Sequence, residues 1–149
     1  MRLLGNILWH IPFLGFVDAI IVYLFGLLLT ITVVAAPIGL GLMEYGKFLF
    51  APFSYSMISK SDLNIDQNPI WQGYSFIIMI IYLPFGLFMA IIGIFQAIGL
   101  ALTIVGIPVA LVVVKSLTTY LNPVNKKCVP VDVVLEIDRR KAQEEIDRY

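Results

Sequence analysis

The chain has 149 residues, of which 60% are hydrophobic and only 13% are charged, whereas a soluble domain is about 45–50% apolar and about 25% charged. Ten basic residues balance ten acidic ones, so there is no basic field to release counterions from a nucleic acid, and we expect no nucleic-acid partner. The single cysteine, Cys128, cannot form an intramolecular disulfide. This composition is typical of a protein embedded in a lipid bilayer.

Two long apolar blocks, residues 3–43 and 67–114, dominate the chain. The first block contains one charge, Asp18, and the second contains none. A membrane span needs about 20 apolar residues, whereas each block, at about 1.5 Å per residue, would form a helix of roughly 60 Å. Each block must therefore turn back, and we place the two turns near residues 22–26 and 93–96.

The sequence repeats with an offset of 71 residues, which aligns Pro37 with Pro108 and Thr32 with Thr103. Residues 15–52 correspond in this way to residues 86–123. Apolar residues match often by chance, so the weight rests on Gly, Pro and Thr keeping one register. We call this spacing the repeat offset, and we infer from it an internal duplication that produces two helical hairpins.

These patterns divide the chain into four parts: a first membrane repeat (1–58), a polar linker (59–73), a second membrane repeat (74–125) and a soluble cytoplasmic tail (126–149). Within the tail, residues 129–138 alternate partly like a β-strand, and residues 139–149 indicate a charged helix that Asp138 could cap. We expect an all-α integral membrane protein with two duplicated hairpins, about four membrane segments and a small soluble tail.

Basic residues flank the apolar blocks, and none falls at a predicted mid-block turn. By the positive-inside rule, a hairpin in each block would place both termini and the linker in the cytoplasm of a multi-pass protein of the bacterial inner membrane. The alternative is one crossing per copy, which would make the copies inverted and put Lys60 outside. A hairpin can also be re-entrant, and the sequence leaves these topologies open.

The helix-breaking residues are Pro37, Gly106 and Pro108. Because proline lacks an N–H and crowds the carbonyl four residues earlier, each helix must kink or break there. In hydrocarbon a freed carbonyl costs several kcal/mol unless a donor meets it. The hydroxyls of Thr32 and Thr103 can bond back to a carbonyl one turn earlier and ease the bend. Such breaks build ion or substrate sites in several transporters, but they also occur in helices that simply pack on other helices.

Polar residues inside the apolar blocks are candidates for function. Asp18 and Gln96, together with the two threonines, could line a pore, or they could lie at the headgroup level. The charges of Glu44, Lys47 and Lys115 fit the cytoplasmic interface, where long side chains reach water.

The remaining signals indicate packing rather than chemistry. Gly93, Ala97 and Ala101 form a stripe of small residues that lets helices approach closely. His10, the only histidine, has no neighbouring ligands at metal-binding spacing, and we expect it at the interface. No nucleophile elbow, phosphate-binding glycine loop or pair of carboxylates is present. We therefore expect no enzyme activity, no cofactor and no metal.

Three segments carry a resemblance to a known family: "LGNILW" (4–9), "TVVAAPIGLGLMEYGKFLFAP" (32–52) and "TIVGIPVALVVVKSLTTYLNP" (103–123). Over about residues 4–127 the chain resembles the YccF-type inner-membrane component domain. The resemblance implies a bacterial inner-membrane protein with about four hydrophobic segments and no assigned activity. The chain departs from the family pattern at Ala35-Ala36 and Ala110, and Ser54 and Asn125 replace the glycine of the family's P-F-G turns.

Two functional hypotheses follow. The first is a homo-oligomeric pore or transport protein, because four short helices are too few to enclose a path within one subunit. The second is a structural or accessory membrane protein that docks on a partner membrane protein through the small-residue stripe and the charged tail.

Overall fold

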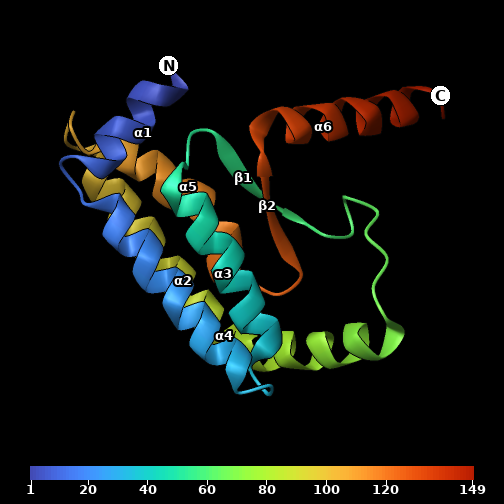
Figure 1. Ribbon diagram of the computed structural model, residues 1–149. Helices are drawn as coiled ribbons and strands as arrows, with labels where there is room; N and C mark the ends of the chain where they lie inside the picture. The colour runs from blue at the N-terminus through green and yellow to red at the C-terminus, as the bar shows by residue number, and fades with distance from the viewer.

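The computed structural model describes residues 1–149, which form six helices and a two-stranded antiparallel ribbon (Figure 1). The mostly helical fold agrees with the predicted class, although the ribbon was not expected. The elements in chain order are α1 (Arg2–His10), α2 (Gly15–Ile31), α3 (Ala36–Phe50), β1 (Tyr55–Ser59), α4 (Pro69–Ala101), α5 (Ile107–Leu121), β2 (Lys126–Pro130) and α6 (Val131–Ile146).

Helices α2 and α3 form one hairpin, and α4 and α5 form another, but the turns are not where the sequence placed them. Residues 22–26 and 93–96 lie inside α2 and α4, and the chain reverses at residues 32–35 and 102–106. Pro37 and Pro108 occupy the first turn of α3 and α5, where the missing N–H leaves no intrahelical bond unmade. Of the two predicted alternatives, a kink or a break, the structure shows a break, because each proline begins a new helix instead of bending one.

The helix lengths limit how the chain can meet a bilayer. Only α4, with 33 residues, is long and apolar enough to cross by itself, and α1 with α2 passes the same test as a pair bent by 80°. Helices α3 and α5 have 15 residues each, or about 22 Å, which is short of the roughly 30 Å of hydrocarbon. Pro84 lies inside α4, and Figure 1 shows the helix changing direction between its green beginning and its yellow continuation.

The repeat offset reappears in the element boundaries. Helix α5 begins and ends at the residues that correspond to the first and last residues of α3, and β2 corresponds in the same way to β1. The ribbon pairs Met57 with Cys128, which are themselves separated by the repeat offset. The strand register is therefore symmetric about this pair.

The two hairpins point in opposite directions. In Figure 1 the turn between α2 and α3 lies at the bottom, whereas the turn between α4 and α5 lies at the upper left, beside α1. The Tyr74 hydroxyl, near the start of α4, donates a hydrogen bond of 2.6 Å to the Val34 carbonyl, which ties α4 to the first of these turns. The two tips therefore lie at opposite ends of the molecule.

The ribbon lies beside α3, and α6 continues from it (Figure 1). In the tail, the predicted β-pattern is wrong beyond Pro130, because α6 begins at Val131 and Asp138 lies inside it rather than at its cap. The predicted polar linker is shortened as well, since α4 begins at Pro69, where the Asn68 side chain accepts a hydrogen bond from the Ile70 N–H.

Buried residues are few, 27 of 149, so most of the apolar surface has no protein partner. The core cluster gathers around Trp9, Ala19, Tyr45, Phe48 and Val112. In contrast, large apolar side chains on α2 and α4 are exposed on most of their helix faces. An exposed apolar surface of this extent is typical of a surface that contacts lipid or another protein.

Candidate functional site

The threonines before each proline are used by the turns themselves. Thr32 Oγ1 donates to the Leu29 carbonyl at 2.6 Å and accepts from the Ala35 N–H at 3.3 Å. In the second hairpin, Thr103 Oγ1 donates to the Leu100 carbonyl and accepts from the Gly106 N–H, both at 3.0 Å. The predicted bond back to the preceding turn is confirmed. Because each hydroxyl already donates once and accepts once, it closes a turn at a hairpin tip.

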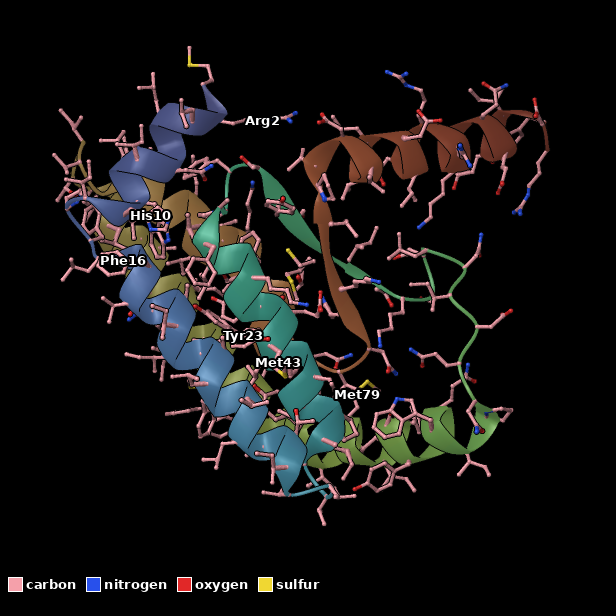
Figure 2. All side chains as sticks on the ribbon, in the orientation of Figure 1. Arg2, His10, Phe16, Tyr23, Met43 and Met79 are labelled. Carbon is pink, nitrogen blue, oxygen red and sulfur yellow. The ribbon has the colours of Figure 1, made fainter.

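The polar residues proposed as a pore lining are not brought together within one chain. Thr32 and Thr103 lie at the two opposite tips, Asp18 is in the first turn of α2, and Gln96 is exposed on α4. Asp18 is the one charged residue in a cavity of about 240 Å³ that Trp9 and Tyr120 also line. Figure 2 shows all side chains in the orientation of Figure 1.

A larger cavity lies where the two hairpins meet. Its volume is about 490 Å³, and apolar residues of α2, α3, α4 and α5 form nearly all of its wall. Tyr45 and Tyr120, whose hydroxyls are 3.2 Å apart, line both cavities. Thr119, a residue that is only 2% exposed, also lines the larger one, and its hydroxyl has no hydrogen-bond partner. This junction therefore combines apolar walls with a few polar groups, as small-molecule sites do.

Side chains of α1 form hydrogen bonds with the end of α3 and with the loop after it, a set of contacts that we call the α1 clamp. The Trp9 Nε1–H donates to the Leu49 carbonyl at 2.8 Å, and His10 Nε2 lies 2.7 Å from the Phe50 carbonyl. These carbonyls belong to the last turn of α3, which has no intrahelical partners. The only histidine thus serves a helix end.

Asn6 completes this clamp. Its side-chain oxygen accepts from the Phe53 N–H at 3.0 Å, and its Nδ2–H donates to Ser54 Oγ at 2.9 Å. Gly5 lies so close to the Phe53 ring that a Cβ would approach its carbons to 2.7 Å. The "LGNILW" segment therefore has a structural role, and Ser54 supplies one of its contacts.

We expect Asn6→Ala to lower the free energy of unfolding by about 2 kcal/mol, because the Phe53 N–H loses its acceptor in a half-buried place. Denaturant unfolding of the purified protein in detergent measures this loss. Asn6→Asp keeps the acceptor oxygen and should recover part of it. Equal stability of Asn6→Ala and the parent would contradict this role of the clamp.

Lys115 serves the same loop from α5. Its Nζ donates to the Pro52 carbonyl at 2.9 Å and lies 5.6 Å from the centre of the Phe53 ring. Pro52 is fully buried, so its carbonyl would otherwise lack a donor. Lys115 therefore joins the two hairpins, a role that its predicted place at an interface did not reveal.

Glu44 and Lys47 form an ion pair on α3, as their spacing allows. The other Glu44 oxygen accepts from the Cys128 N–H at 2.9 Å, at the edge of β2. Burial, and then the Glu44 charge, raise the pKa of the Cys128 thiol to about 11, and Lys47 opposes them. Glu44 thus fixes the ribbon to α3, and burial together with the Glu44 charge leaves Cys128 as an unreactive thiol at neutral pH.

Alkylation of Cys128 should therefore depend strongly on pH. In the folded protein we expect the iodoacetamide labelling rate to rise toward a midpoint near the raised pKa of about 11, against the ordinary value of 9.0 in the denatured chain. Mass spectrometry after timed labelling measures both midpoints. The same midpoint in the folded and the denatured protein would show that the thiol is not buried against α3.

The small-residue stripe packs within its own hairpin only in part. Gly93 and Ala97 are buried, and Gly93 faces Leu117 and Tyr120 of α5, whereas Ala101 is exposed. A closer crossing, which the sequence interpretation missed, joins Gly26 of α2 to Gly39 of α3: a Cβ on either would lie 2.7 Å or less from the other's carbonyl oxygen. The sequence could have revealed this crossing, because Gly26 and Gly39 align at the repeat offset with two further small residues, Ala97 and Ala110.

Comparison with known proteins gives one match. Residues 4–55 match the family model described as the YccF inner membrane component domain. The matched segment runs from α1 to the first residue of β1, so it covers the first hairpin and its clamp. The resemblance inferred from the sequence is confirmed over these residues. No curated protein and no solved structure matches the chain.

Proposed function

We propose a structural or accessory role for this inner-membrane protein, whose residues 4–55 match the family model of the YccF inner membrane component domain. In this proposal the apolar helices lie in the cytoplasmic leaflet, and the ribbon and α6 remain in water. The protein presents its charged side to a partner membrane protein. Both termini and the linker are cytoplasmic, and the two hairpins arise from an internal duplication.

The observation that carries the proposal is the position of the ribbon. It lies beside α3 (Figure 1), and a two-stranded ribbon leaves an unpaired edge on each strand. Open sheet edges are not tolerated in the hydrocarbon region, so a bilayer cannot enclose the helices from all sides. Neither α2 nor α4 contains a basic residue. We therefore infer that these two helices are embedded and that the ribbon side faces the cytoplasm.

This placement accommodates three features together. The embedded helices α2 and α4 carry no basic residue, in keeping with the positive-inside rule. Helices α3 and α5, which are too short to cross the bilayer, do not have to cross it. The α2–α3 and α4–α5 turns, which point in opposite directions, both stay within one leaflet. It corresponds to the re-entrant alternative that the sequence left open.

Helix α6 supports docking on a partner. None of its 16 residues is buried. Two ion pairs hold it to the rest of the chain: Arg2 with Asp132 at 2.8 Å and Lys141 with Asp62 at 2.6 Å. The Arg2 guanidinium lowers the pKa of Asp132 through a hydrogen bond and its charge. A charged helix that contributes no core residue is available for contact with another protein.

Single cysteines in a Cys128→Ser background test the topology. A cysteine placed in the linker, residues 59–73, should be labelled only from the cytoplasmic side. Val34→Cys and Val105→Cys, which lie at equivalent positions of the two hairpin tips, should resist a membrane-impermeant maleimide added outside the cell. Outside labelling of the linker or of either tip would contradict the embedding without crossing.

A homo-oligomeric pore or transport protein is the second candidate. Hairpins that point in opposite directions resemble the inverted repeats of many transporters, whose substrate sites lie at the repeat junction. The cavity of about 490 Å³ with the unpartnered Thr119 hydroxyl lies at that place in this chain. Purified protein in liposomes tests this candidate: no flux under any gradient, together with a monomer by mass in detergent, would exclude it.

A further inference from the structure

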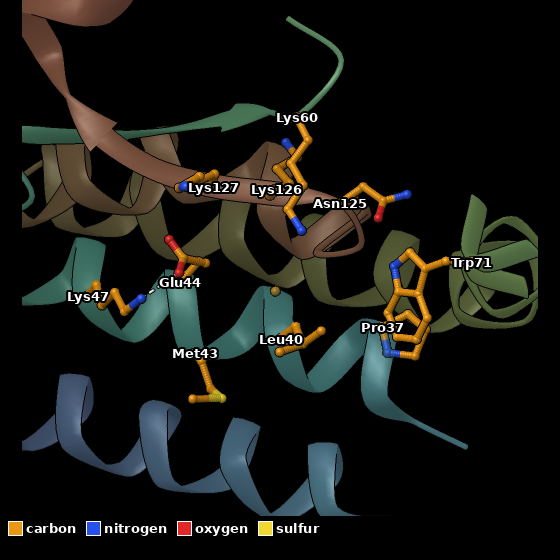
Figure 3. A pocket seen from close by; sticks show the side chains of 11 residues that line it. Pro37, Leu40, Met43, Glu44, Lys47, Lys60, Trp71, Asn125, Lys126 and Lys127 are labelled. Atoms are coloured by element: carbon orange, nitrogen blue, oxygen red, sulfur yellow. Dashed lines mark hydrogen bonds and ion pairs between the residues drawn. The ribbon is translucent and has the colours of Figure 1, made fainter. Parts of the chain in front are cut away.

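A separate pocket of about 250 Å³ lies on the polar side, between α3 and the ends of the ribbon strands (Figure 3). Lys60, Lys126 and Lys127 come from the ribbon and the residue that follows β1, and Glu44 and Lys47 come from α3. Trp71, from the first turn of α4, closes one end in Figure 3. Elements far apart in the sequence thus meet around one small space.

The pocket has an excess of positive charge. Four lysines line it against one carboxylate, Glu44, and that carboxylate is already engaged by Lys47 and the Cys128 N–H. The other three lysines, Lys60, Lys126 and Lys127, take part in none of the four ion pairs of the chain, which are those of Arg2–Asp132, Glu44–Lys47, Glu136–Arg140 and Asp62–Lys141. Their positive charge is therefore not neutralised within the protein.

Lys126, at the start of β2, is half-buried. Burial lowers the pKa of its ammonium group, and the Asp62 charge opposes that effect to a smaller extent. Asp62 itself bonds to Lys141 on α6. An anion in the pocket would supply the charge that this ammonium lacks.

The aromatic residues place the pocket at the membrane interface. Trp71 and Tyr74 have ring centres 6.1 Å apart, and tryptophan and tyrosine concentrate at the headgroup level of bilayers. Ile70, next to Trp71, is 82% exposed, and beyond it α4 presents further exposed apolar side chains such as Phe76 and Ile77. A ligand in the pocket therefore has an apolar helix directly beside it.

We propose that this pocket binds the phosphate of an anionic phospholipid headgroup from the cytoplasmic leaflet, while the acyl chains lie along the exposed side of α4. Basic pockets on the cytoplasmic side of membrane proteins suit this chemistry. The pocket is smaller than the roughly 300–1,000 Å³ of sites that enclose whole drug-sized ligands, so it takes the headgroup alone.

The pocket occurs once although the hairpins occur twice. At the repeat offset, Lys126 and Lys127 correspond to Tyr55 and Ser56, and Lys47 corresponds to Thr118. The lysine cluster is therefore a feature of one half of the protein. Its lipid binding does not depend on whether the protein is an accessory protein or a pore.

Thermal unfolding of the full chain in detergent, titrated with phosphatidylglycerol, phosphatidylcholine or inorganic phosphate, tests the proposal. We expect phosphatidylglycerol to raise the Tm and phosphatidylcholine to leave it unchanged. Lys126→Gln with Lys127→Gln should weaken the apparent affinity for phosphatidylglycerol about 30-fold, since each lysine near an anionic surface contributes about fivefold. Lys60→Gln, whose side chain makes no hydrogen bond in the fold, is a second variant and should weaken it about fivefold.

The matched control is Arg139→Gln with Arg148→Gln, which removes the same charge from α6 and the residues just after it and should leave the affinity as it is. Lys126→Arg with Lys127→Arg should also keep it. Equal loss in the α6 control would show bulk attraction instead of a site. Unchanged affinity in the lysine variants, or equal stabilisation by phosphatidylcholine, would overturn the proposal. Equal stabilisation by inorganic phosphate would show a site for a free anion and would overturn the lipid assignment.

Discussion

Gly41→Ala should lower the free energy of unfolding by about 3 kcal/mol, because it places a methyl group where the second half of the chain touches the first. A Cβ at this position would lie 1.8 Å from the Pro123 carbonyl oxygen and 2.6 Å from its carbon. Both atoms belong to backbone, and Pro123 is fully buried, so α3 and the segment after α5 must separate. Denaturant unfolding in detergent, monitored by circular dichroism, measures the loss.

Gly73→Ala is the matched control, because nothing lies within 4 Å of a Cβ there. We expect it to be neutral or slightly stabilising, since alanine favours a helix more than glycine does. Equal stability of Gly41→Ala and Gly73→Ala would contradict the contact between the two halves.

Trp9→Ala should cost about 3–5 kcal/mol, the usual effect of removing a large aromatic side chain from a core. Trp9 is 6% exposed and donates to the Leu49 carbonyl. Its indole also packs on Gly15, where a Cβ would come within 2.0 Å of Nε1. The substitution leaves a cavity and a carbonyl without its donor, and α1 loses its hold on α3.

Leu8→Ala is the control in the same helix, because Leu8 is 47% exposed and should change stability by about 0.5 kcal/mol or less. Trp9→Phe keeps part of the apolar contact but loses the N–H, so its loss should fall between the two. A Trp9→Ala protein as stable as Leu8→Ala would show that α1 does not clamp the first hairpin.

The sequence was sufficient for the class of protein and for the repeat offset, because composition and the spacing of Gly, Pro and Thr can be read along the chain without knowing which segments pair. It misplaced the turns for a physical reason. A proline in an apolar run can kink a helix or begin one, and the difference depends on whether the preceding turn closes. Here Thr32 and Thr103 close that turn, so Pro37 and Pro108 each begin a helix directly after a hairpin tip.

The ribbon and the candidate lipid pocket could not be predicted in the same way. From the local sequence pattern, the residues of β1 are placed at the end of the first membrane repeat, and Lys126 and Lys127 of β2 are interpreted only as charges that flank the second. Both the strand and the role of these lysines depend on the pairing of β1 with β2, which are far apart in the chain. A local sequence pattern does not contain that pairing. The clamp role of Asn6 and Trp9 also needed the position of Phe53 and Leu49.

The pairing of Met57 with Cys128 tests the central claim, that the two halves join through a symmetric antiparallel ribbon. Hydrogen bonds join Lys60 with Asn125 and Val131 with Ser54. In the alternating pattern of an antiparallel ladder, Met57 and Cys128 are then a non-hydrogen-bonded pair, with Cα atoms about 4.5 Å apart, within the range of a disulfide.

Met57→Cys should therefore form an intramolecular disulfide with the native Cys128 when the purified protein is oxidised at alkaline pH, where the Cys128 thiol ionises. Intact mass would show the loss of two hydrogens, and thiol labelling would fall to zero. Ile58→Cys, whose side chain lies on the opposite face of the ribbon, should keep both thiols free under the same conditions. A disulfide in Ile58→Cys, or none in Met57→Cys, would contradict the register and with it the symmetric junction of the two hairpins.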